Sequence, residues 1–248
     1  MVWPSSPGVG LLVHVHPSAV VAPEAELADD VVIGPYAVVH GCVRLAAGVR
    51  VDSHAVLGGD PQDLTFTGGP TTVEIGADTV IREAAIVHRS TTSTPTRIGA
   101  GCVIMGQVHV AHDCQLGDGV VVSQAVSLGG HVAVDDGAVI GAMSMVQQHV
   151  RIGRQAVVGA MSKVTRDVLP FCGVEGSPAT HRALNVVGLK RSGMPPADYR
   201  ALRHVFDLLR DGHELDSWAD GPVAQLVEFL AGPSRRGISP FRHGGEAV

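Results

Sequence analysis

The chain has 248 residues, a formal net charge of −6 and a hydrophobic content of 45 %, with only 4 % aromatic residues. The negative charge excludes a general nucleic-acid-binding protein, which needs a basic face, and no apolar run is long enough to span a bilayer. Many glycines and few aromatics favour a core of small aliphatic side chains, and we expect a cytoplasmic protein.

The N-terminal residues MVWPSSPGVG lack the basic region and the long apolar region of a signal peptide. We expect residues 1–10 to be a disordered leader. The cysteines form no CxxC pair, so neither a zinc knuckle nor a disulfide framework is predicted. We expect these thiols to be small buried hydrophobes: Cys42, Cys102, Cys114 and Cys172.

An aliphatic residue recurs at every sixth position over most of residues 11–184. The series is Val15, Val21, Leu27, Ile33, Val39, Leu45, Val51 and Leu57, then Ile75, Ile81 and Val87, and then Ile98, Ile104, Val110, Leu116, Val122, Leu128, Val134, Ile140, Val146, Ile152, Val158 and Val164. This period is the hexapeptide signature of a parallel β-helix, in which three hexads, about 18 residues, complete one triangular coil. We predict an all-β left-handed parallel β-helix over residues 11–184, with the hand taken from similarity to known hexapeptide proteins.

Glycines accompany this repeat, and two segments interrupt it. A glycine often follows the aliphatic residue, as at Gly76 and Gly141, and we expect such glycines to take a positive φ at the corners of the coil. The repeat breaks at GGDPQDLTFTGGPTTVE, residues 58–74, and at HRSTTSTPTR, residues 88–97. We predict two extruded loops, which in solenoids usually lie on one face and often carry function.

The composition changes after Val164, where the repeat ends. Apolar residues at helical spacing predict two helices, over residues 197–210 and 222–230, with Gly212 ending the first. We predict a C-terminal α-helical domain over residues 185–243 that covers an end or a side of the solenoid. Residues 244–248 are expected to be a disordered tail.

The segment GQVHVAHDCQLG, residues 106–117, gathers several groups that could carry chemistry. Residues eighteen apart lie one above the other on adjacent coils, so Asp113, His131 and His149 are expected to form one column. His112 lies beside Asp113, and we expect Gly130 to leave a gap next to its imidazole. Because the hexad aliphatics fill the inside of the coil, this cluster should lie on a surface or in a cleft.

Three interpretations of the cluster remain open at this point. The histidines are solvated turn residues, or His109, His112 and His131 bind zinc, as in gamma-class carbonic anhydrases. Alternatively, one histidine acts as a general base, a carboxylate fixes its tautomer, and a backbone N–H near Gly130 receives the developing oxyanion. The third interpretation needs no metal.

Several segments outside the plain hexads carry a further pattern. They are AHDC (111–114), GGHVAVDD (129–136), IREAAIVHR (81–89), PQDL (61–64), GPTTVEIG (69–76), NVVGLKRSG (185–193) and SRRGISPFR (234–242). With these segments the chain resembles one family, the acyl-carrier-protein-dependent UDP-N-acetylglucosamine O-acyltransferases of lipid A synthesis. The resemblance extends from about residue 16 to residue 242, and its loop and C-terminal motifs are more specific than the hexads.

This resemblance implies a homotrimer that transfers a 3-hydroxyacyl chain from acyl carrier protein to the 3-hydroxyl of UDP-N-acetylglucosamine, with no metal and no cofactor. It implies that His112 is the general base, that Asp113 orients it or the sugar, and that Gly130 offers its N–H to the thioester oxygen. It implies sugar contacts from Gln62 and Asp63, and a nucleotide and phosphate region lined by His109, His131, Gln148, Asn185 and Arg191. Acyl carrier protein is acidic, and the candidates for a local basic patch are Lys163, Arg166, Lys190 and Arg191.

The sequence also departs from the family pattern. In the expected nucleotide pocket, this chain has uncharged residues at four positions where the family has charged or basic ones: Thr65, Gln147, Val187 and Ser192. At the acyl end, Ala160 replaces a glycine and is followed by Met161, which favours a shorter chain. We therefore keep as alternatives the same chemistry on another nucleotide sugar, the N-acyl branch of the same fold, a gamma-class zinc enzyme and a catalytically dead scaffold.

Overall fold

Three parallel sheets form the body of the protein, which a computed structural model describes at residues 13–213, 215 and 221–242. The first sheet continues into an antiparallel hairpin and contains β1 (His14–Val15), β4 (Val32–Ile33), β7 (Arg50–Val51), β10 (Val80–Ile81), β13 (Val103–Ile104), β16 (Val121–Val122), β19 (Val139–Ile140), β22 (Val157–Val158), β24 (Cys172–Gly176) and β25 (Ala179–Leu184). The second contains β2 (Val20–Val21), β5 (Val38–Val39), β8 (Val56–Gly59), β11 (Ile86–His88), β14 (His109–Val110), β17 (Ser127–Leu128), β20 (Met145–Val146) and β23 (Lys163–Val164). The third contains β3 (Glu26–Leu27), β6 (Val43–Leu45), β9 (Val73–Ile75), β12 (Thr96–Ile98), β15 (Gln115–Leu116), β18 (Ala133–Val134) and β21 (Arg151–Ile152).

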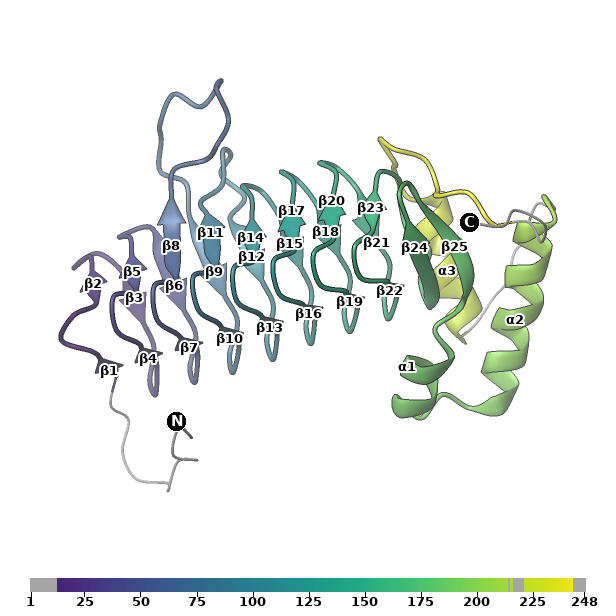
Figure 1. Ribbon diagram of the computed structural model, residues 1–248, viewed down its shortest axis with the longest axis horizontal. Helices are drawn as coiled ribbons and strands as arrows, with labels where there is room; N and C mark the ends of the chain where they lie inside the picture. Colours follow the sequence, from purple (N-terminus) through teal and green to yellow (C-terminus); the bar gives the residue numbers. More distant parts are fainter. Residues whose placement is uncertain (1–12, 214, 216–220, 243–248) are drawn as a thin grey trace.

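Successive strands pass from the first sheet to the second and then to the third, so the chain winds into a left-handed parallel β-helix (Figure 1). Between coils without a loop, residues eighteen apart pair in register, as Val122 does with Ile140. The hexad residues point inward, and Ile104, Leu128 and Ile140 are fully buried. The predicted coil and its aliphatic core are confirmed.

The glycines that follow the hexad residue do not have the predicted role. Gly76 and Gly141 are absent from the positive-φ glycines among the described residues. A Cβ added at Gly76 would lie 2.5 Å from the backbone nitrogen of Ala100, and one at Gly141 would lie 2.5 Å from that of Ala160. Close approach of the next coil therefore requires glycine, while other residues, Asp113 among them, take the positive φ.

Both interruptions of the repeat are loops, and both join a second-sheet strand to a third-sheet strand. The first lies between β8 and β9 and the second between β11 and β12, on the upper side of the solenoid in Figure 1. The turns that contain Asp113, His131 and His149 join the same two sheets. The prediction that the loops share one face is confirmed, and we call this edge the histidine corner.

In the part of the chain that the structure describes, the C-terminal region contains the β24–β25 hairpin and three helices, α1 (Val186–Arg191), α2 (Pro196–Arg210) and α3 (Gly221–Ala231). β24 pairs with β22, so the hairpin extends the first sheet while the helices cover the C-terminal end of the solenoid (Figure 1). Leu202, Phe206 and Leu226 share a second core with the hairpin. The two predicted helices are confirmed. The predicted leader, residues 1–10, and tail, residues 244–248, lie outside the described residues. No helix in the described ranges could cross a membrane.

A buried ion pair joins the last coils to the helices. Arg151 Nε lies 2.7 Å from Oδ2 of Asp167, whose side chain is fully buried. Arg151 Nη1 donates to the carbonyl of Phe229 at 3.1 Å, and its guanidinium lies 4.2 Å from the centre of the Phe229 ring. These contacts fix α3 against the solenoid.

His181 gives this C-terminal part a predicted dependence on pH. Its ring accepts the N–H of Leu169 and donates to the carbonyl of Ser239, and burial lowers its pKa to about 4. As the pH falls, this histidine binds a proton in the unfolded chain near pH 6.5 but in the folded chain only near pH 4. The free energy of unfolding therefore decreases between these pH values, by at most about 3 kcal/mol. Urea unfolding at pH 7.5 and 4.5 should show a smaller loss in His181→Gln than in the parent. Equal losses in both proteins would contradict the assignment.

Candidate active site

Asp113, His131 and His149 form the predicted column at the histidine corner. The N–H of His131 donates to the carbonyl of His112, and the N–H of His149 to that of Gly130, both at 3.0 Å. The three column residues have φ of 59°, 60° and 65°, which turns each side chain outward at the same place on successive coils. The rings of His131 and His149 are stacked, with centroids 4.6 Å apart.

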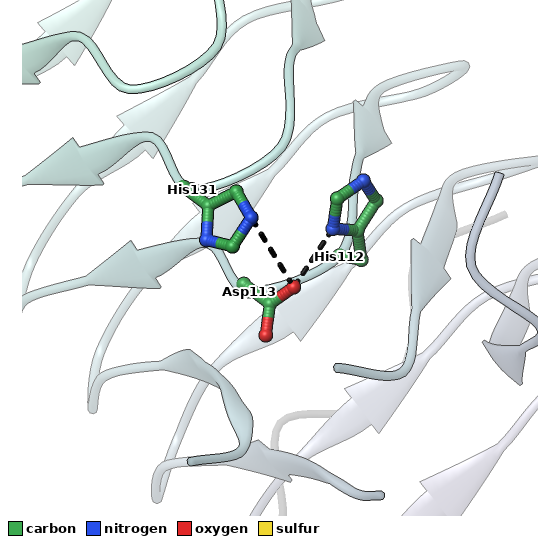
Figure 2. A group of neighbouring side chains, drawn as sticks. All are labelled: His112, Asp113 and His131. Carbon is green, nitrogen blue, oxygen red and sulfur yellow. Dashed lines mark hydrogen bonds and ion pairs between the residues drawn. The ribbon is translucent and has the colours of Figure 1, made fainter. Parts of the chain in front are cut away.

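One carboxylate oxygen joins the two imidazoles nearest to it (Figure 2). Oδ2 of Asp113 lies 2.8 Å from Nδ1 of His112 and 3.7 Å from Nε2 of His131. An ionised carboxylate only accepts, so Nδ1 of His112 carries the proton that it donates. Nε2 of His112 has no partner among the described residues and is left as an acceptor.

The second loop holds the Asp113 carboxylate in place. Thr91 donates to it through its N–H and, at 2.6 Å, its hydroxyl, and Thr92 donates through its hydroxyl at 3.2 Å. The hydroxyl of the buried Thr96 accepts the N–H of Asp113 at 2.8 Å. Burial acts to raise the pKa of Asp113, but the hydrogen bonds from Thr91 and His112 hold it below its ordinary value. Sequence reasoning missed these three threonines. The hydroxyl-rich stretch STTST, residues 90–94, was the only signal for Thr91 and Thr92, and it does not include Thr96.

Gly130 makes room for the base itself. A Cβ at this position would lie 2.5 Å from Cε1 and 2.7 Å from Nε2 of His112. The expected gap beside the imidazole is therefore filled by the imidazole, and that expectation was wrong. The N–H of Gly130 has no acceptor among the described residues, so it can donate to a ligand.

A Gly130→Ala variant should lose activity because its methyl group must displace the His112 ring. A misplacement of about 1 Å costs on the order of 100-fold in rate, and we expect a fall of that size in kcat. Gly59→Ala is the matched control, since the Cβ would meet its nearest neighbour, His88, at an ordinary 3.6 Å. Steady-state kinetics should separate the two variants, and an unchanged kcat in Gly130→Ala would refute this role.

The first loop brings Asp63 towards the two imidazoles. Oδ1 of Asp63 accepts the N–H and the hydroxyl of Thr65, each at 2.8 Å. These bonds lower the pKa of Asp63, and charge on His112 and His131 lowers it further. Gln62 is exposed beside it.

Arg89 fixes the base of the first loop. Its guanidinium lies 2.8 Å from Oδ1 of Asp60, donates to the carbonyl of Gly69 at 3.1 Å and sits over the ring of Phe66. The loop therefore starts from an anchored position, although most of it is exposed.

His109 points to a different partner. Its Nε2 lies 3.4 Å from Nδ1 of His88, and its Nδ1 lies 3.4 Å from the Ser127 hydroxyl. Burial lowers the pKa of both histidines, that of His88 to about 4, which favours the neutral form of each ring. Sequence reasoning did not identify His88.

The proposed set of three zinc-binding imidazoles is not assembled. Among the described residues, the group with ligand atoms close enough for a metal is His112, Asp113 and His131, without His109. The carboxylate of that group already accepts hydrogen bonds from Thr91, Thr92 and His112. The geometry favours a proton acceptor held by a carboxylate over a metal centre.

Other predicted site residues lie at other corners of the same chain. Asn185 accepts the N–H of Gly188 as the N-cap of α1 and donates to the carbonyl of Gln155, at the turn between the third and first sheets. Arg191 lies on α1 and is exposed. Ala160 and the 71 % exposed Met161 lie at the turn between the first and second sheets. Within one chain, these residues do not meet His112.

The departures from the family pattern have ordinary local contacts. Thr65 supports Asp63, and Ser192 is the C-cap of α1, with its hydroxyl donating to the carbonyl of Leu189 at 3.0 Å. Gln147 is exposed, as is Val187. The neighbouring Gln148 is also exposed, and its carbonyl accepts Nε of Arg236 at 2.8 Å.

Comparison with known proteins gives consistent similarities. A family pattern described as Udp N-acetylglucosamine O-acyltransferase, Domain 2, matches residues 167–239, and one described as bacterial transferase hexapeptide (six repeats) matches residues 95–130. The acyl-[acyl-carrier-protein]–UDP-N-acetylglucosamine O-acyltransferase of Brucella ovis is 41 % identical over 90 % of this chain and 91 % of its own length.

Solved structures extend the similarity to the fold. The UDP-N-acetylglucosamine acyltransferase of Campylobacter jejuni is 29 % identical, with a TM-score of 0.76 over 92 % of this chain and 100 % of its own. The UDP-N-acetylglucosamine O-acyltransferase of Moraxella catarrhalis is 28 % identical, with a TM-score of 0.78 over 91 % of this chain and 99 % of its own. The similarity therefore includes both the β-helix and the C-terminal helices.

Proposed function

The chain belongs to the acyl-[acyl-carrier-protein]–UDP-N-acetylglucosamine O-acyltransferase family, and from this we propose that it transfers a 3-hydroxyacyl chain from acyl carrier protein to the 3-hydroxyl of UDP-N-acetylglucosamine. The observation that carries the mechanism is the 2.8 Å contact of Asp113 with Nδ1 of His112, which leaves Nε2 as an acceptor. Acyl carrier protein and the nucleotide sugar are the partners, and we place the reaction in the cytoplasm.

His112 acts as the general base in this mechanism. Its Nε2 takes the proton of the sugar hydroxyl while the hydroxyl oxygen forms a bond to the thioester carbonyl carbon. The carboxylate of Asp113 stabilises the imidazolium, and the N–H of Gly130 donates to the oxyanion. The intermediate then releases the carrier thiolate, the C–S bond breaks, and His112 returns the proton to sulfur.

Asp63 and Gln62 are proposed to hold the sugar. The first loop carries both, and Asp63 lies near enough to His112 and His131 for their charges to affect its pKa. A carboxylate there accepts hydrogen bonds from sugar hydroxyls, which orients one of them towards Nε2 of His112.

We propose a homotrimer because the remaining site residues need a second copy of the chain. Asn185 and Arg191 lie at another corner, and the acyl-end residues Ala160 and Met161 lie at the third. The first sheet also presents an outward, half-exposed row of apolar side chains suited to packing between copies: Val80, Val103, Val121, Val139 and Val157. Native mass spectrometry should give three times the chain mass, and a monomer would refute the shared site.

A panel of substrates tests the function. The purified protein should acylate UDP-N-acetylglucosamine in preference to other UDP-sugars, using acyl carrier protein thioesters as donors. Among these donors, those with short 3-hydroxyacyl chains should react faster than those with long ones. The reason is that Ala160, in place of the family's glycine, and Met161 add side-chain volume at the acyl end of the site. Equal or better use of the longest chain would contradict the length assignment, and no transfer with any donor would contradict the function.

A further inference from the structure

Two cationic side chains of the C-terminal segment reach the histidine corner next to its last histidine. Nη1 of Arg235 lies 3.4 Å from Nε2 of His149. Arg236 donates from Nε to the carbonyl of Gln148 at 2.8 Å, and the Ser234 hydroxyl accepts the N–H of Gly237 at 2.8 Å. The segment is therefore fixed against the coil, on the upper side in Figure 1 where both loops also lie.

We call this group of His149, Arg235 and Arg236 the basic cluster. Among the described residues, neither guanidinium lies within ion-pair distance of a carboxylate, whereas Arg44, Arg82, Arg89 and Arg154 on the solenoid are all paired. Burial lowers the pKa of His149, and the charges of His131, Arg235 and Arg236 lower it further. Unpaired guanidinium groups beside an imidazole are suited to an anion with several oxygens, above all a phosphate.

The basic cluster lies on the same column of side chains as Asp113, which contacts the proposed base His112. The stacked rings connect His149 to His131, which contacts Asp113, the partner of His112. Two coils separate His149 from Asp113, which places the cluster about 10 Å along the column. A sugar whose hydroxyl lies at His112 would extend its phosphate along this column. The adjacent Gln147 is uncharged and the pKa of His149 is lowered, so the positive charge at this place comes from Arg235 and Arg236.

We propose that Arg235 binds a phosphate of the nucleotide-sugar substrate, with His149 holding its guanidinium and Arg236 fixing the segment through the carbonyl of Gln148. This proposal rests on the function above. The guanidinium of Arg235 would donate to phosphate oxygens while the sugar reaches His112, and Nε2 of His149, which accepts from Arg235, would hold the guanidinium in place. A phosphate of the acyl carrier's phosphopantetheine arm has the same chemistry, and the test separates the two sources.

The test compares Arg235→Gln and His149→Asn with the parent. An asparagine is chosen at position 149 because φ there is 65°, a conformation that asparagine tolerates. Each change should raise the KM for UDP-N-acetylglucosamine roughly 10- to 100-fold, with little change in the KM for the acyl donor. The matched control is Arg203→Gln, whose guanidinium pairs with Asp207 on the exposed side of α2.

Calorimetric titration with UDP alone supplies a readout that does not need acyl transfer. The parent should bind UDP, Arg235→Gln should bind it more weakly by a similar factor, and the double variant should lose less than the sum of the single losses. If the parent transfers acyl chains while Arg235→Gln keeps its KM and UDP affinity, the proposal fails and the function stands. If only the KM for the acyl donor rises, the phosphate belongs to the carrier arm and the proposal also fails. Weaker UDP binding in a protein without transfer activity would support the phosphate site and contradict the function.

Discussion

A His112→Gln variant is expected to keep its fold but to lose at least about 100-fold in kcat for acyl transfer, the lower end of what a positioned general base contributes. Glutamine fills much of the same space, and its amide cannot take a proton from a hydroxyl at neutral pH. The loss should appear in kcat more than in the KM values, since the base acts in the transition state.

His204→Gln is the control for this change, because His204 is exposed on α2, far along the chain from the histidine corner. Circular dichroism and native mass should be the same for the parent and both variants. A His112→Gln variant with more than a tenth of the parental kcat would show that another group accepts the proton.

An Asp113→Asn variant is expected to lose up to about 10⁴-fold, the cost of the corresponding change in a Ser-His-Asp triad. Asparagine tolerates the φ of 59° at this position, so the backbone should not change. Thr91 and Thr92 would still donate to the amide oxygen, which turns the NH₂ group towards Nδ1 of His112. That nitrogen must then accept, so the proton moves to Nε2 and the base is blocked.

Nitrogen NMR of labelled His112 distinguishes this mechanism from a general structural defect. The parent should show the proton on Nδ1, and Asp113→Asn should show it on Nε2. A Thr91→Val variant, which removes one of the donors to Asp113, is expected to keep the parental tautomer with a smaller loss of rate. Activity close to that of the parent in Asp113→Asn would mean that Asp113 does not fix the tautomer.

The regularity of the hexads made the solenoid and the column predictable. From Ile98 to Val164 no loop interrupts the repeat, so spacing alone placed Asp113 under His131 and His131 under His149. Helical periodicity likewise located α2 and α3 within about one residue at each end. These features depend on local pattern, which a single sequence contains.

Contacts made by the loops were not predictable in the same way. Thr91 and Thr92 reach Asp113 across more than twenty positions, and nothing in a run of hydroxyls says which carboxylate they meet. The positions of Asn185 and of the Arg235 segment depend on how the helical part packs on the last coils. The glycines that follow the hexad residue were predicted to have a positive φ, and this was wrong. A glycine required by the close approach of two coils cannot be distinguished in the sequence from a glycine required by a turn.

The most direct measurement is the identity of the product in one reaction. The purified protein, UDP-N-acetylglucosamine and a 3-hydroxyacyl thioester of acyl carrier protein should yield UDP-N-acetylglucosamine carrying one acyl group. Tandem mass spectrometry and NMR should place this group as an ester on the 3-hydroxyl, and the product should be lost in His112→Gln. An acyl group on nitrogen or on another hydroxyl, or undiminished product from His112→Gln, would contradict O-acyl transfer with His112 as the base.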